Sequence, residues 1–190
     1  TGPINSMNCF IQLVTGIFTN IGTCPNLDFT NTATLMSTGQ QASVCVDVTC
    51  PNPDLANYSI SNDADAFTAF NGVNNLSSQT VAIADNVVLT IDTQTPNFNF
   101  NNCTLIMGSG SQIIINPNCT LGLHNNTVIY SCPQMWRGIS VGIGSQIVMR
   151  NSTIRDAEYA ITLDDHANYE IRDSYILNCV TGLYTDPSLS

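Results

Sequence analysis

The residue types that could do chemistry gather in one short run, Asp164-Asp165-His166. Two carboxylates can cleave a glycosidic bond when both face that bond, one acting as acid and the other as base or nucleophile. Adjacent residues of a strand point to opposite faces, so Asp164 and Asp165 do not naturally converge. The run also separates two alternating apolar segments, where acidic residues are ordinary turn content. We therefore interpret it as a solvated turn first and as a catalytic candidate second.

A second group could bind rather than react. Arg150 and Arg172 stand 22 residues apart, one repeat of the pattern described below, and His124 occupies the matching outward position one repeat earlier. A basic stripe of this kind could contact an acidic glycan. The arginines could equally pair with Glu170 or Asp173, which would leave little net stabilisation on an exposed surface.

Calcium is the one cofactor for which the sequence offers ligands. Asp63-Ala64-Asp65 and Asp164-Asp165 supply carboxylate oxygens. Neither an EF-hand loop nor the Gly-Gly-x-Gly-x-Asp repeat of calcium-binding coils occurs in the sequence. We expect no cofactor and leave calcium open.

Composition narrows the class of partner. Only 9% of the 190 residues are charged, lysine is absent, and the formal net charge is −10. Nucleic acids and anionic membrane surfaces need clustered basic residues, so neither is an expected partner. No run of 18 or more apolar residues occurs, and we expect no membrane span.

The sequence contains eight cysteines and no paired CxxC spacing typical of a metal site. Four of them lie among Pro, Asn and Thr near the start and are the candidates for extracellular disulfides: Cys9, Cys24, Cys45 and Cys50. Cys132 and Cys179 align to one corner about two repeats apart, too far for a bridge, and are interpreted as small buried residues. Whether Cys103 and Cys119 meet is left open.

These candidates must be positioned by a repeat. From about Thr80, short alternating apolar segments recur, and three rows of residues step along the chain together. The first row is Phe98, Leu121, Ile147 and Tyr169, the second is Leu105, Val128, Ile154 and Ile176, and the third is Ile113, Ile139, Ile161 and Leu183. Three rows with a period in the twenties and no helical spacing predict an all-β fold, a right-handed three-sided parallel β-helix.

Small residues follow the same period. Gly138, Ala160 and Gly182 each precede the third-row residue of their unit, which predicts a backbone turn that tolerates little side chain. One polar row occupies a single point of successive turns: Asn102, Asn125, Asn151 and Asp173. Stacked amides can hydrogen-bond to one another and to the turn backbone, so we interpret this row as a structural ladder.

Two regions follow from the repeat. Residues 1–78 lack it and are rich in turn formers, which predicts an irregular, disulfide-containing, loop-rich β region that caps the first end of the coil. Residues 79–190 form the β-helix. The last unit finishes near Asp186 without a closing element, so we expect either further polypeptide or a partner subunit at that end.

Two runs of the sequence carry a resemblance to a known family: Cys132-Pro133-Gln134-Met135-Trp136-Arg137-Gly138-Ile139 and, after it, Asn151-Ser152-Thr153-Ile154-Arg155-Asp156-Ala157. They resemble right-handed, pectate-lyase-like β-helix surface proteins of the Bacteroidota. The resemblance covers about residues 80 to 186. It implies a segment of a large secreted adhesin or surface fibre, or of a carbohydrate-active enzyme. β-Helix lyases abstract a proton with Lys or Arg, and lysine is absent here.

The resulting expectation is a structural or adhesive module of an extracellular, cell-surface protein or appendage, with no catalytic activity of its own. Its partners would be other segments or subunits of the same assembly, as a homo-oligomer, and possibly glycans. A polysaccharide lyase or glycoside hydrolase acting on an acidic glycan is the alternative. An oligomerisation unit is a further one.

Overall fold

The computed structural model describes residues 30–34, 41–45, 55–132 and 134–185. The chain divides into two compact units, one of residues 6–49 and one of residues 1–5 with 50–190. In the smaller unit, β1 (Thr30–Thr34) and β2 (Gln41–Cys45) pair antiparallel. The predicted disulfide candidates Cys9, Cys24 and Cys50 lie outside the described residues, and Cys45 ends β2, so the disulfides stay a prediction.

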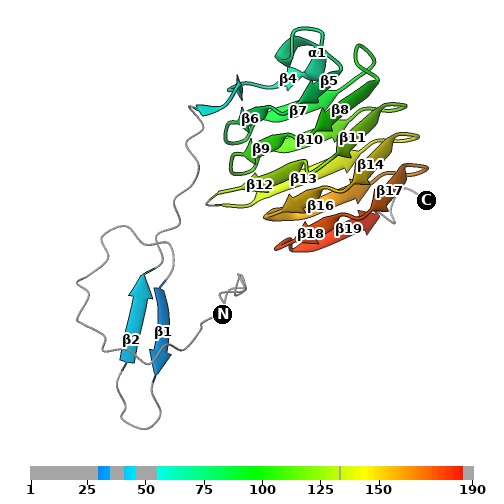
Figure 1. The fold of residues 1–190 in the computed structure, drawn as a ribbon. Coiled ribbons are helices and arrows are strands. Elements are labelled where there is room, and N and C mark those ends of the chain that lie inside the picture. Colours follow the sequence, from blue (N-terminus) through cyan, green and yellow to red (C-terminus); the bar gives the residue numbers. More distant parts are fainter. Residues whose placement is uncertain (1–29, 35–40, 46–54, 133, 186–190) are drawn as a thin grey trace. The chain divides into compact units, whose positions relative to one another are not determined.

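The larger unit is a stack of coils with three parallel sheets, each named here by its first strand (Figure 1). The β3 sheet contains β3 (Tyr58–Ile60), β6 (Thr80–Ile83), β9 (Thr104–Met107), β12 (Val128–Ser131), β15 (Thr153–Arg155) and β18 (Tyr175–Leu177). The β4 sheet contains β4 (Ala64–Asp65), β7 (Val88–Ile91), β10 (Gln112–Ile115), β13 (Trp136–Val141), β16 (Ala157–Leu163) and β19 (Thr181–Thr185). The β5 sheet contains β5 (Asn75–Ser77), β8 (Asn97–Asn101), β11 (Thr120–His124), β14 (Gln146–Arg150) and β17 (Asn168–Arg172).

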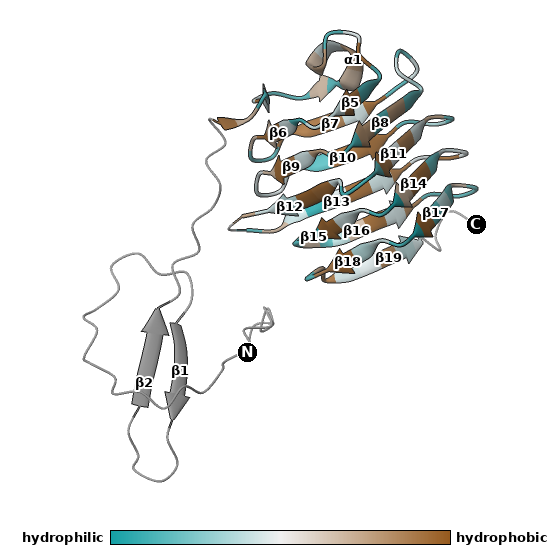
Figure 2. Cartoon of the chain, viewed as in Figure 1, coloured by the Kyte–Doolittle hydropathy of each residue, from teal (hydrophilic) through white to brown (hydrophobic). Residues whose placement is uncertain are grey.

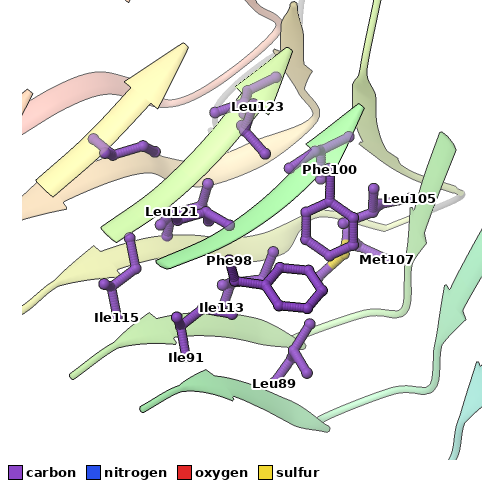
Figure 3. Packing of buried hydrophobic residues seen from close by; sticks show 14 of the residues in the cluster. Leu89, Ile91, Phe98, Phe100, Leu105, Met107, Ile113, Ile115, Leu121 and Leu123 are labelled. Carbon is purple, nitrogen blue, oxygen red and sulfur yellow. The ribbon is translucent and has the colours of Figure 1, made fainter. Parts of the chain in front are cut away.

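The strands form because apolar and polar residues alternate, which sends every second side chain into the coil. Ile139 pairs with Ile113 on one side and Ile161 on the other, and Leu121 lies between Phe98 and Ile147 in the same way. The first and third predicted rows are therefore confirmed, and so is the all-β, three-sided parallel β-helix. Figure 2 shows the resulting distribution of apolar and polar residues, and Figure 3 shows Phe98 and Phe100 directed into the packed interior.

The second row was wrong at one residue. Ile129, not Val128, pairs with Leu105 and Ile154 and is fully buried, whereas Val128 faces outward between Thr104 and Thr153. The cause is the corner before β12, where Asn125 and Asn126 both adopt positive φ. Neighbouring corners use one such residue, so this corner is one residue longer and shifts the strand's register by one.

The coil begins earlier than the boundary at residue 79 that the repeat indicated. β3, β4 and β5 already pair in parallel with β6, β7 and β8. Between β4 and β5 the chain forms the short helix α1 (Ala66–Ala69), which Asp65 caps through a 2.8 Å hydrogen bond accepted from the Thr68 amide. Phe70 follows the helix and is fully buried against Tyr58, Phe98 and Phe100. At the first end of the described coil α1 covers the strands (Figure 1), and the Phe70 ring fills the interior there.

Of the predicted small-residue turns, one position only, residue 138, requires a glycine. Gly138 has φ +108°, and a Cβ there would overlap the Tyr159 carbonyl oxygen in the next coil. The register between β13 and β16 shifts at this point, as in a β-bulge, and Ala160 is the extra buried residue. Gly182 lacks a positive φ, and a Cβ there would meet only Ile176 Cγ2 at an ordinary 3.6 Å. Among the described residues, no helix is long and apolar enough to cross a bilayer.

Candidate functional site

The structure places Asp164-Asp165-His166 in the turn between β16 and β17. Asp164 shapes this turn through its backbone, donating to the Val141 carbonyl and accepting from the Ala167 amide. His166 adopts φ +55°, and its Nδ1 lies 2.8 Å from an Asp165 carboxylate oxygen. The His166 and Asp165 side chains are 79% and 42% exposed. The geometry is that of a solvated turn in which one carboxylate pairs with its neighbouring imidazole.

The basic stripe lies on the outer face of the β5 sheet. His124 pairs in register with Arg150, and Arg150 with Arg172, so the three side chains stand on successive strands. Glu170 lies between the arginines. Its Oε1 is 2.9 Å from Arg150 Nη2 and 2.8 Å from Arg172 Nε. The pairing of the arginines with Glu170, one of the two interpretations of the sequence, is present, and Glu170 offsets part of the positive charge of the stripe.

Burial and two charged neighbours act on the pKa of His124. Burial lowers the pKa of His124, and the nearby Arg150 guanidinium lowers it further, while Glu170 opposes both. The imidazole Nε2 lies 3.3 Å from Asn99 Oδ1. Gly122 leaves the space for this contact, because a Cβ at Gly122 would overlap both side chains. Burial and Arg150 therefore favour the neutral form of His124.

The pH dependence of stability follows from that neutral imidazole. The neutral form is favoured in the folded chain, so its contribution is present above the unfolded pKa of about 6.5 and is lost as the pH falls through that value. We expect the free energy of unfolding to decrease between pH 7.5 and pH 5.5, and His124→Gln to flatten the decrease. Urea unfolding at each pH measures it, with His166→Gln as the matched control. An equal slope in His124→Gln and in the wild type would contradict the assignment.

The polar row of Asn102, Asn125, Asn151 and Asp173 marks one corner of four successive coils, and all four residues have φ between +49° and +53°. Their backbone amides link the coils, since Asn102 donates to the His124 carbonyl and Asn151 to the Arg172 carbonyl. The side-chain amides donate to residues of the preceding coil: Asn102 to Ser78 Oγ, Asn125 to Asn101 Oδ1 and Asn151 to Asn126 Oδ1. They do not bond to the next member of the row, as the simplest ladder would require.

A substitution in this row separates backbone conformation from side-chain bonding. Asn151→Ala places an alanine at φ +50° and removes a 3.1 Å hydrogen bond, so we expect a loss of about 1–2 kcal/mol of unfolding free energy. Asn151→Gly relieves the backbone cost and should lose less. Asn97→Ala, at an exposed strand position, is the control and should change stability by less than about 0.5 kcal/mol. Equal effects of alanine and glycine at residue 151 would refute the conformational argument.

The sequence interpretation missed a set of small polar residues that lie inside the corners. Thr127 Oγ1 accepts from the Cys103 amide at 3.2 Å, and its one proton is shared between the Phe100 and His124 carbonyl oxygens, 3.1 and 2.7 Å away. Ser145 Oγ bonds to the Cys119 amide and to the Asn116 carbonyl at another corner. Each follows a left-handed Asn or Gly by one residue, a signal that could have located them. Their role is to satisfy buried backbone groups where the strands change direction.

Three cysteines described in the structure are free thiols: Cys103 and Cys119, both buried, and the half-buried Cys179. Cys103 and Cys119 therefore do not form a bridge. Cys103 lies against the Leu76 and Asn101 carbonyls, and Cys119 against that of Pro117. Cys132 is half-buried and disulfide-bonded, so its interpretation as a small buried residue was wrong.

The carboxylates considered for calcium have structural partners. Asp63 Oδ1 accepts from the Val88 amide at 2.9 Å, which links two coils, and Asp65 caps α1. The hydrogen bond from the Thr68 amide lowers the pKa of Asp65. Within the described ranges, no three His, Cys, Asp or Glu side chains are placed to hold a metal ion together.

Comparisons with protein-family models, with curated proteins and with solved structures give no match to this chain. The outer face of the coil offers one basic stripe with a bridging glutamate and one solvated acidic turn. The corners join coil to coil through the side chains of Asn102, Asn125 and Asn151.

Proposed function

We propose that this chain is a structural module of a large extracellular surface protein or appendage, in which the stacked coils serve as a stiff, adhesive or spacing element without catalysis of their own. One observation carries the proposal: polar side chains along the coil corners are used to hold one coil to the next. The amides of Asn102, Asn125 and Asn151 each bond to the preceding coil. Side chains that are bonded in this way stabilise the stack of coils and are not available for catalysis.

The interior supports the same proposal. The buried core runs without a break from Ile60 to Leu163 and contains the aliphatic rows and an aromatic cluster around Phe98. Burying such side chains contributes roughly 1.5–3 kcal/mol each, which offsets the ordering cost of a long parallel stack. A continuous core of this kind resists local opening, as a spacer exposed to proteases must.

The absence of catalysis is tested by an assay for polysaccharide cleavage. The chain is incubated with neutral and acidic polysaccharides, and new reducing ends and unsaturated uronate products are measured. We expect no signal above that of Asp165→Asn, which removes one carboxylate of the acidic turn. Product formation that the wild type shows and Asp165→Asn loses would overturn the proposal and favour a polysaccharide lyase or glycoside hydrolase.

A second candidate function is binding of an acidic glycan along the outer face of the β5 sheet. The register of His124, Arg150 and Arg172 on three successive strands favours it, since parallel strands repeat at about 4.8 Å. Glu170 opposes it. If the stripe binds polyanionic glycans, Glu170→Gln should increase retention on an acidic-glycan array and Arg150→Gln should decrease it. Equal retention of both variants and the wild type would exclude the stripe as the site.

A further inference from the structure

One of the charges on the outer face of the β5 sheet depends on pH. Among the outward residues of the described strands of this sheet, the only ones with a charged or imidazole side chain are His124, Arg150, Glu170 and Arg172. Two arginines and one glutamate give the face a net charge of +1 while the imidazole is neutral. Protonation of the imidazole doubles that charge.

His124 and Arg150 are neighbours on this face. They pair in register on β11 and β14, and adjacent parallel strands lie about 4.8 Å apart. The Arg150 side chain is 56% exposed, and His124 is half-buried. An elongated polyanion that lies across the two strands therefore meets both side chains at once.

The contact between His124 and Asn99 shows which ring nitrogen takes up the additional proton. The imidazole Nε2 lies 3.3 Å from Asn99 Oδ1. An amide oxygen only accepts hydrogen bonds, so Nε2 carries a hydrogen in the neutral ring. The additional proton therefore binds to Nδ1, and the hydrogen bond to Asn99 is retained. Protonation adds a positive charge to the face and does not require the ring to move.

We propose that His124 is a pH sensor on this face, whose protonation at mildly acidic pH strengthens the binding of an acidic glycan across His124 and Arg150. The inference rests on glycan binding by the β5 sheet, the second candidate function, and adds its regulation. A histidine suits this role because its ordinary pKa is about 6.5. Burial and Arg150 lower the pKa of His124, and Glu170 opposes them, so the charge appears on the acidic side of that value.

The groups around the imidazole determine the direction of the change. Arg150 is the charged neighbour on β14, while β8 on the other side presents only asparagines on this face and the corner after β11 begins with two more. Glu170 is shared by Arg150 and Arg172, at 2.9 and 2.8 Å. A carboxylate of a bound glycan adds a negative charge beside His124, which favours the protonated ring. Binding and protonation therefore strengthen each other by the same factor.

Binding of carboxymethyl-dextran to the full chain at pH 7.5 and at pH 5.5 tests the proposal, with dextran as the uncharged control. The carboxylates of this probe are ionised at both pH values, because an ordinary carboxyl has a pKa of about 4. We expect the wild-type affinity for carboxymethyl-dextran to rise by about three- to tenfold at the lower pH, the effect of one added charge at close range. His166→Gln, which removes the other histidine, should respond to pH as the wild type does.

Two variants of His124 separate its charge from other effects of pH. His124→Gln should keep the weaker affinity at both pH values. His124→Arg carries a permanent charge, so it should bind at pH 7.5 about as tightly as the wild type at pH 5.5. In the wild type, saturating carboxymethyl-dextran should raise the midpoint of the His124 titration, followed by nuclear magnetic resonance, by about 0.5 to 1 pH unit, which is the same change in affinity seen from the proton.

Two outcomes would overturn the inference and leave glycan binding in place: an affinity that is equal at both pH values, or a rise that His124→Gln shows in full. Absence of binding at both pH values would refute the glycan-binding function together with this inference, so the two failures are distinguishable. Circular dichroism of each variant at both pH values establishes that the coil is folded.

Discussion

Replacing Gly138 with alanine should lower the free energy of unfolding by about 3 kcal/mol or more. An alanine would have to keep φ near +108° and place its Cβ onto the Tyr159 carbonyl oxygen. That oxygen belongs to the neighbouring strand of the same sheet, so relief requires two coils to separate locally. Both costs act on the folded state. Urea unfolding followed by far-ultraviolet circular dichroism measures the change.

Gly182→Ala is the control, because it occupies the corresponding place in the last coil. Its φ is not positive, and its nearest neighbour is Ile176 at 3.6 Å, so a methyl group fits. We expect a change within about 0.5 kcal/mol. Similar losses at residues 138 and 182 would show that the glycines act through the general flexibility of the chain, and not through the bulge between β13 and β16.

Truncation of Phe70 to alanine should cost about 3–5 kcal/mol. The ring is fully buried and lies 5.1 Å from the Phe98 ring, 5.3 Å from Tyr58 and 5.9 Å from Phe100, measured between centroids. Removing it opens a cavity at the first end of the coil, where α1 no longer has an anchor. We expect hydrogen exchange to accelerate most strongly in β3, β4 and β5 and less in the middle of the stack.

Phe67→Ala tests whether the effect belongs to the buried ring. Phe67 lies on α1, three residues before Phe70, and is 44% exposed, so its truncation should cost far less than that of Phe70. Unfolding of both variants under the same conditions gives the comparison. If Phe67→Ala were as damaging as Phe70→Ala, the helix itself rather than its buried anchor would close the coil.

The two confirmed rows could be predicted because their positions depend on alternation and, over the last coils, on a steady repeat of 22 residues. Ile139, Ile161 and Leu183 satisfy both conditions, and each pairs with the residue one repeat away. The second row failed at Val128 because a corner can contain one or two left-handed residues without changing the direction of the next strand. Because Val128 and Ile129 are adjacent and both apolar, the alternation of apolar residues does not show which of the two faces the interior.

The first coil, formed by β3, β4 and β5, could not be predicted from the sequence repeat for a different reason. A helix stands between β4 and β5, so the spacing there departs from the later repeat. Parallel pairing with β6 to β8, rather than sequence periodicity, makes this segment a coil. The candidate site was predictable in part: the register of His124, Arg150 and Arg172 follows from the repeat, whereas the bridging geometry of Glu170 depends on side-chain conformations that spacing does not determine.

The central claim is that residues far apart in the chain stack directly above one another inside a three-sided coil. Methyl–methyl nuclear Overhauser effects among selectively labelled isoleucines test it most directly, because Ile113, Ile139 and Ile161 share one row and are buried. The account predicts contacts between Ile113 and Ile139 and between Ile139 and Ile161. It predicts a much weaker signal, or none, between Ile113 and Ile161. Absence of both neighbouring contacts in a folded chain would contradict it.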